Sequence, residues 1–174
     1  MSLLGMESWD VYGINNVTDI YPGLDANSSI VVGGGRCGSA ALRNQSAQGG
    51  GPGIAIPAPT FNGGYWGQAV KVENFHTNYA LLVLDAAGGP GGILAFLRIL
   101  NNGSVEAWKG TQVALGTRLG ATGAGLITAG HYFHLGYEWK ISLTGYTRIW
   151  INGTLQFDSG VVDMSTIFTG TGVW

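Results

Sequence analysis

The stretch that decides the fold is Tyr146-Thr147-Arg148-Ile149-Trp150-Ile151-Asn152-Gly153-Thr154-Leu155. Its dipeptide Asn152-Gly153 is the strongest hairpin signal in the chain, because both central residues of a type I′ turn need positive φ. The flanking residues 146–151 and 154–157 are therefore predicted to be paired strands. Successive side chains of a strand point to opposite faces, so Ile149 and Trp150 are expected on different sides of the sheet.

The segment before this hairpin, residues 131–143, is also predicted to be a strand. Its alternation places Glu138 and His134 on the outward side. The expected core side is made by the odd-numbered residues His131, Phe133, Leu135, Tyr137 and Trp139.

Further strands are predicted throughout the chain, and almost no segment has helical periodicity. Predicted strands cover residues 65–75, 80–86, 93–100, 105–109 and 111–115, with shorter apolar pieces at 2–9, 30–32, 40–42 and 54–56. Asn101-Asn102-Gly103 is a predicted hairpin turn, and the Gly- and Thr-rich residues 116–130 are predicted to be a loop. About ten to twelve short strands with regular turn signals are typical of a sandwich or jelly roll. We therefore predict an all-β, two-sheet antiparallel jelly-roll sandwich.

The composition excludes several classes of protein. The chain has 174 residues, including 31 glycines without a three-residue period, so it is not collagen. Charged residues make up only 10% and the net charge is −2, whereas aromatic residues make up 11%, which excludes a disordered chain. No basic cluster suits nucleic acid, no apolar run suits a membrane span, and the start does not resemble a signal peptide. The lone Cys37 excludes an intrachain disulfide and is expected to be a small buried apolar residue.

Two segments carry a resemblance to a known family: Leu126-Ile127-Thr128-Ala129-Gly130-His131-Tyr132-Phe133-His134-Leu135 and residues 146–155. With Met6–Trp9 and the passage from Gly35 to Leu42, they resemble the concanavalin A-like lectin/glucanase superfamily, in particular its laminin-G-like jelly rolls. The glycine- and alanine-rich style is similar to versions found in structural proteins of tailed bacteriophages. The resemblance implies one jelly-roll domain over residues 1–174. Because family members usually have further strands after the segment around Asp163, this domain either lacks its last strands or is completed by a partner chain.

The sequence offers no catalytic residues, metal ligands or cofactor site. Glucanases of this superfamily place acidic residues two to five apart on one strand, but Glu73, Glu106 and Glu138 are isolated here. His131 and His134 would point to opposite faces of a strand, which disfavours a metal pair. Sugars stack on flat aromatic rings, so the candidate glycan-stacking residues are Tyr65, Trp66, Trp108, Tyr146 and Trp150. The alternative is that most of these rings belong to the core.

Scarce charge suggests a surface that is partly covered by a neighbour, since a free monomer usually carries more charge. The first hypothesis is a non-enzymatic virion protein of a tailed phage, serving as capsid decoration, fibre or tail spike, with weak glycan binding. The alternative is a carbohydrate-binding module of a bacterial surface or secreted protein, and a glucan hydrolase is the third. The expected partners are other virion proteins, copies of the chain itself and cell-surface glycan, with no nucleic acid and no membrane. The expected location is the virion.

Overall fold

The computed structural model describes residues 28–31, 41–44, 56–57, 63–75, 79–85, 93–110, 116–165 and 172–173. The chain divides into two compact units, residues 1–57 together with Trp174 and residues 58–173. The single domain over residues 1–174 stays a prediction. Cys37 and the predicted strands at residues 2–9 and 111–115 lie outside the described residues.

The first unit contains three short strands, β1 (Ser28–Val31), β2 (Ala41–Asn44) and β3 (Ile56–Pro57). Strands β1 and β2 pair in antiparallel fashion, with Ser28 opposite Asn44 and Val31 opposite Ala41. They coincide with the two apolar pieces that the sequence places on either side of a glycine-rich turn.

In the second unit, one sheet has the order β11-β10-β9-β4. Its strands are β4 (Gly63–Lys71), β9 (Tyr132–Lys140), β10 (Tyr146–Ile151) and β11 (Thr154–Asp158). All neighbouring pairs are antiparallel. The Asn-Gly turn between β10 and β11 has the predicted geometry, because Asn152 has a φ of 51° and Gly153 one of 79°.

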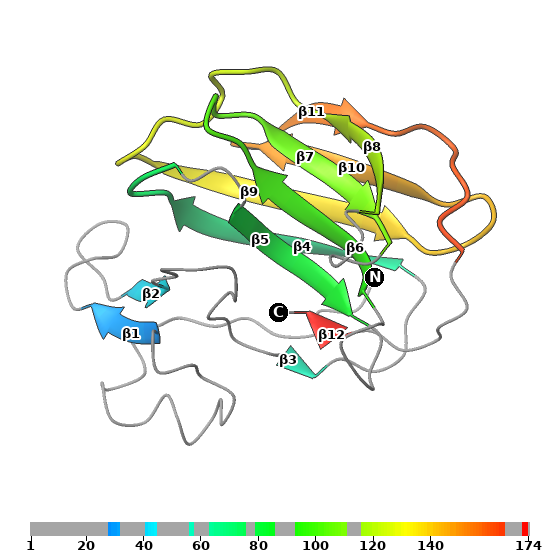
Figure 1. Cartoon of the computed structure of the whole chain (residues 1–174), viewed down its shortest axis with the longest axis horizontal. Helices are drawn as coiled ribbons and strands as arrows, with labels where there is room; N and C mark the ends of the chain where they lie inside the picture. The colour runs from blue at the N-terminus through cyan, green and yellow to red at the C-terminus, as the bar shows by residue number, and fades with distance from the viewer. Residues whose placement is uncertain are drawn as a thin grey trace. The chain divides into compact units, whose positions relative to one another are not determined.

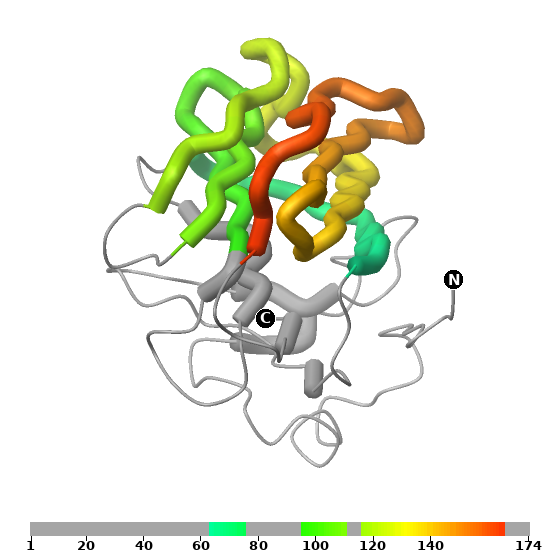
Figure 2. The backbone as a smooth tube through the Cα atoms, turned by 90° about the vertical axis from the view of Figure 1, so that its right-hand side faces the viewer, coloured from blue at the N-terminus to red at the C-terminus, as the bar shows by residue number. Residues whose placement is uncertain are grey.

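The other sheet of this unit runs in the order β12-β5-β6-β7-β8. Its strands are β5 (Tyr79–Asp85), β6 (Ile93–Ile99), β7 (Val105–Lys109), β8 (Thr117–Ala121) and β12 (Gly172–Val173). Figure 1 shows β5 to β8 in front of the first sheet, and Figure 2 shows β6 to β8 and β9 to β11 as two separate layers. The described part of the chain contains no helix, so none could cross a membrane there.

The core lies between these two layers, and its buried strand residues are alternate residues of β6, β7, β9 and β10. Full burial of a side chain such as Leu135 contributes about 1.5–3 kcal/mol, so this layer supplies much of the stability. Its central members are Ala95, Leu97, Ile99, Val105 and Ala107 from one sheet and Phe133, Leu135, Tyr137, Trp139, Ile149 and Ile151 from the other. The all-β, two-sheet antiparallel sandwich is therefore confirmed. The expected core side of β9 is confirmed for Phe133, Leu135, Tyr137 and Trp139. It is wrong for His131, which lies before the start of β9 and is exposed.

The expected loop over residues 116–130 is also wrong in part, because Thr117–Ala121 forms strand β8. A glycine inside a strand can mark the place where another group approaches the backbone closely. Gly120 is such a position, since an added Cβ would lie 2.6 Å from Cζ of Phe157 in the facing sheet. The glycine that suggests a loop in the sequence makes room for a core ring in the structure.

Candidate functional site

The candidate site lies on the side of the β11-β10-β9-β4 sheet that faces away from the core. Along β10, Thr147, Ile149 and Ile151 are buried while the intervening residues are partly exposed. We call this surface the outer face. Its residues are Tyr65, Gly67, Lys71, Tyr132, His134, Gly136, Glu138, Lys140, Tyr146, Arg148, Trp150 and Asp158.

Two glycines form a floor at the middle of the outer face, because Gly67 on β4 is paired with Gly136 on β9. The ring of Tyr65 lies over this floor. A Cβ added to Gly136 would collide with the Tyr65 hydroxyl and would lie 3.1 Å from Cβ of Trp150. A Cβ added to Gly67 would lie 2.9 Å from Cε1 of Tyr65. The floor therefore exists only because neither residue has a side chain.

His134 flanks the same floor, since the Cβ added to Gly67 would lie 3.2 Å from its Nε2. The backbone of His134 is held by Asn152 from the β10–β11 turn. Its N–H donates to Oδ1 of Asn152 at 2.9 Å, and its carbonyl accepts from the Asn152 N–H at 2.8 Å. The ring of Tyr65 and the imidazole of His134 thus lie over the same glycine, Gly67, while the Tyr65 hydroxyl lies over Gly136. Tyr65 is 44% exposed.

Beside this pair lies a charged row, in which register places Tyr65, Glu138, Arg148 and Asp158 side by side across the four strands. Nε of Arg148 donates to Asp158 at 2.8 Å, and its Nη1 donates to Glu138 at 3.4 Å. The guanidinium also lies 4.4 Å above the ring of Tyr146, whose hydroxyl donates to Glu138 at 2.9 Å.

These contacts set the protonation of the row. The hydrogen bond to Glu138 raises the pKa of Tyr146, and the hydrogen bond from Arg148 lowers the pKa of Asp158. Glycoside hydrolysis by two carboxyl groups needs one of them to carry a proton that it can donate. Glu138 and Asp158 share a face but both accept hydrogen bonds from Arg148, which disfavours that role.

The five predicted glycan-stacking residues lie in three different places. Tyr65, Tyr146 and Trp150 lie together on the outer face. Trp66 packs against the core, because it follows Tyr65 directly on β4 and so points to the opposite side. Trp108 lies on the other sheet, stacked on Phe96 with ring centroids 5.8 Å apart.

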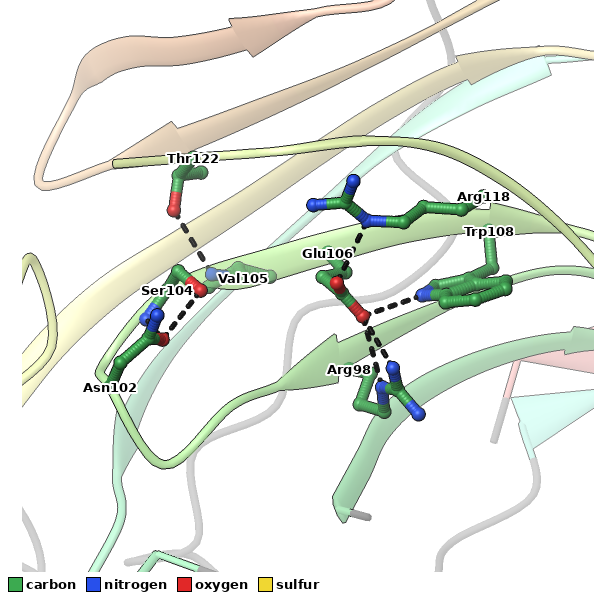
Figure 3. Close-up of polar contacts among 8 residues, drawn as sticks. All are labelled: Arg98, Asn102, Ser104, Val105, Glu106, Trp108, Arg118 and Thr122. Carbon is green, nitrogen blue, oxygen red and sulfur yellow. Dashed lines mark hydrogen bonds and ion pairs between the residues drawn. The ribbon is translucent and has the colours of Figure 1, made fainter. Parts of the chain in front are cut away.

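Trp108 belongs to a polar cluster around Glu106 (Figure 3). In the sequence, Glu106 is isolated from other acidic residues. The Glu106 carboxylate accepts from Arg98 Nη2 at 2.7 Å, from Arg118 Nε at 2.8 Å and from Trp108 Nε1 at 2.9 Å. Burial alone would raise the pKa of Glu106, but these hydrogen bonds and the two positive charges hold it below its ordinary value. Its oxygens are fully occupied, so this cluster stabilises the sheet and offers no reactive group.

A pocket opens at one end of the outer face, where β9 begins. It is lined by Leu126, Thr128, His131, Tyr132, Phe133 and Asn152. Tyr132 is also an outer-face residue, paired with Lys71, whose Nζ lies 5.9 Å from the ring centroid of Tyr132. The described residues contain no group of three or more His, Cys, Asp and Glu that could hold a metal ion.

Sequence reasoning missed the Tyr65–His134 pair because it depends on how β4 and β9 are paired. A local signal was present, since Tyr65 and His134 each precede a glycine by two residues, at Gly67 and Gly136. On a strand, that spacing places the ring and the glycine on the same face.

No protein-family model matches the chain, and no curated protein matches it in sequence. Its fold is shared with solved structures of carbohydrate-processing enzymes. An endo-β-1,4-glucuronan lyase from the fungus Trichoderma reesei is 17% identical with a TM-score of 0.61, over 92% of this chain and 79% of that chain. Alginate lyase Aly36B, in a variant with a lysine and a tyrosine replaced by alanine and with alginate tetrasaccharide bound, is 17% identical with a TM-score of 0.58. That match covers 95% of this chain and 82% of the lyase.

A carbohydrate esterase from the Shiga toxin-encoding bacteriophage phi24B also has this fold, at 14% identity and a TM-score of 0.51, over 84% of this chain and 77% of that chain. These neighbours contradict two sequence-based expectations, that the chain is a structural virion protein and that it is not an enzyme. The expectation of a non-enzymatic protein rested on the lack of a carboxylate pair. That lack argues only against glycoside hydrolysis and not against other reactions of carbohydrates. The expected partners and the location on a virion stay predictions.

Proposed function

We propose that the chain is a polysaccharide lyase that cleaves an acidic polysaccharide on its outer face. The observation that carries this proposal is that the ring of Tyr65 and the imidazole of His134 both lie over Gly67, with the Tyr65 hydroxyl over the neighbouring Gly136. The jelly-roll fold shared with the glucuronan and alginate lyases supports it. Membership of the concanavalin A-like superfamily is part of the same proposal.

Cleavage by β-elimination requires groups that move protons. A base removes the proton from C5 of a uronate residue, next to its carboxylate. The electron pair forms a C4=C5 double bond, the C4–O bond breaks, and the leaving oxygen takes up a proton. No water is consumed and no carboxylate pair is needed, so this chemistry agrees with a face on which Glu138 and Asp158 are bound to Arg148.

The outer face offers a residue for each task. Tyr65 and His134 exchange protons with the sugar at C5 and at the leaving oxygen. Tyr146 and Trp150 provide rings on which neighbouring sugars stack. Lys71, the last residue of β4, is paired with Tyr132 at the start of β9. Lys140 is the last residue of β9. A polyanion lying along β9 would therefore meet a positive charge at each end.

The test is incubation of the purified chain with glucuronan and with alginate, while the ultraviolet absorbance of the unsaturated uronate product is followed. The wild-type chain is expected to generate that absorbance, and Tyr65→Phe and His134→Ala are expected to lose it. Tyr137→Phe is a matched control, because it removes a phenolic hydroxyl on the core side of the same sheet. Loss of activity in Tyr137→Phe as well, or full activity in Tyr65→Phe, would count against the outer face as the place of cleavage.

A further inference from the structure

The pocket at the start of β9 continues the outer face. Asn152 links the two, because it lines the pocket and also holds the backbone of His134 through two hydrogen bonds. Tyr132 belongs to both as well. A group bound in the pocket would therefore lie next to the residue that the proposed function places at the cleaved bond.

The walls of the pocket are of two kinds. Leu126, Tyr132 and the nearly buried Phe133 are the apolar residues of the lining, and Thr128, His131 and Asn152 provide hydrogen-bonding groups. A sugar ring has apolar C–H faces and a rim of hydroxyl groups, so it matches a pocket that combines apolar walls with a few polar groups. The lining contains no Asp, Glu, Lys or Arg. It therefore suits recognition of a sugar residue through its hydroxyl groups.

Hydrogen bonds to neighbouring segments hold the loop that builds the pocket. The N–H of Ile127 donates to the carbonyl of Gly103 at 3.0 Å, and the N–H of Gly130 donates to that of Val72 at 2.8 Å. Within the loop, Nδ1 of His131 lies 3.2 Å from the carbonyl oxygen of Ala129. These contacts tie the loop to the β6–β7 turn and to the end of β4, so the pocket is formed before any ligand binds.

We propose that this pocket is a subsite for one sugar residue of the polysaccharide, adjoining the residue that Tyr65 and His134 act on. The inference rests on the proposed function, because the occupant belongs to the same polymer. The subsite would bind through stacking on Tyr132 and hydrogen bonds to Thr128, His131 and Asn152.

The experiment uses Thr128→Trp, which fills the pocket from an exposed position on its loop. The matched control is Thr117→Trp, because Thr117 is also exposed but lies on β8 of the other sheet. Loss of one sugar's contacts is expected to raise KM for the cleaved polymer roughly tenfold in Thr128→Trp while kcat changes little. Thr117→Trp is expected to leave both constants unchanged.

Binding is measured separately, by nuclear magnetic resonance titration of Tyr65→Phe with alginate and glucuronan tetrasaccharides. Shifts of the amides at residues 126–133 and 152, lost in Tyr65→Phe/Thr128→Trp, support the subsite whether or not the wild type cleaves. Shifts there without cleavage by the wild type would overturn the proposed lyase activity alone. Cleavage by the wild type, with no shifts at those amides and an unchanged KM in Thr128→Trp, would overturn the subsite alone.

Discussion

The hydroxyl of Tyr65 occupies the space above Gly136 in which any other residue would carry its Cβ. This relationship joins two adjacent strands and places a phenolic hydroxyl at the centre of the outer face. It also makes the site sensitive to a single methyl group added at Gly136 on β9.

Gly136→Ala is expected to displace the Tyr65 ring, because the new methyl group would collide with its hydroxyl and approach Trp150. A misplacement of about 1 Å can cost about 100-fold in rate, so lyase activity should fall by that order. Overpacking should cost about 1–3 kcal/mol of stability. Kinetics and thermal unfolding of the variant measure both effects.

Gly123→Ala is the matched control for that variant. Gly123 has no atom near the position of an added Cβ, so the substitution should leave activity and stability close to wild type. Equal losses in the two variants would show that the Tyr65–Gly136 contact is not what positions the site.

Lys140→Gln is expected to raise KM several-fold without lowering kcat, since Lys140 supplies charge that attracts the polymer and does not lie at the Tyr65–His134 pair. Salt screens exposed charges over about 10 Å at 0.1 M, so the difference from wild type should shrink as ionic strength rises. Lys109→Gln, on the other sheet beside Asp163, is the control. A defect in Lys140→Gln that persists at high salt would argue against a role in attraction.

Glu106→Gln should lower stability by about 1–3 kcal/mol at pH 7, because the buried carboxylate accepts bonds from two arginines and from the indole N–H of Trp108. Hydrogen bonds and the two arginines hold the pKa of Glu106 below its ordinary value in the folded chain, so its contribution is full above the ordinary pKa of a glutamate. It is lost as the pH falls through the folded pKa. Melting curves of wild type and variant should therefore converge in acid, and lyase activity at pH 7 should stay unchanged.

Tyr137→Phe should make the chain more resistant to alkali. Burial raises the pKa of Tyr137 to about 12, so between pH 10 and 12 the unfolded chain releases this proton while the folded chain keeps it. The free energy of unfolding then falls by about 1.4 kcal/mol per pH unit from this group. Denaturant titrations at pH 9 and pH 11 should show a smaller loss in the variant, and equal losses would contradict the assignment.

Local patterns were enough to predict the sandwich. Asn152-Gly153 determines its own turn through backbone φ, and the alternation of β9 determines which side is buried. The site could not be predicted in the same way, because Tyr65 reaches Gly136 and His134 only through the pairing of β4 with β9. Strand β8 was missed for a similar reason, since the partner that explains Gly120 is Phe157 on the facing sheet. Glu106 likewise finds its arginines on neighbouring strands.

The central claim is that Tyr65 transfers a proton during elimination on the outer face. Its most direct test is the ultraviolet absorbance of unsaturated uronate when wild type and Tyr65→Phe are incubated with glucuronan and with alginate. The account predicts a steady rise with wild type on at least one polymer and a loss of at least about 100-fold with the variant, the lower end for a general acid–base group. Unsaturated product formed equally by both proteins, or by neither while the polymers remain intact, would contradict it.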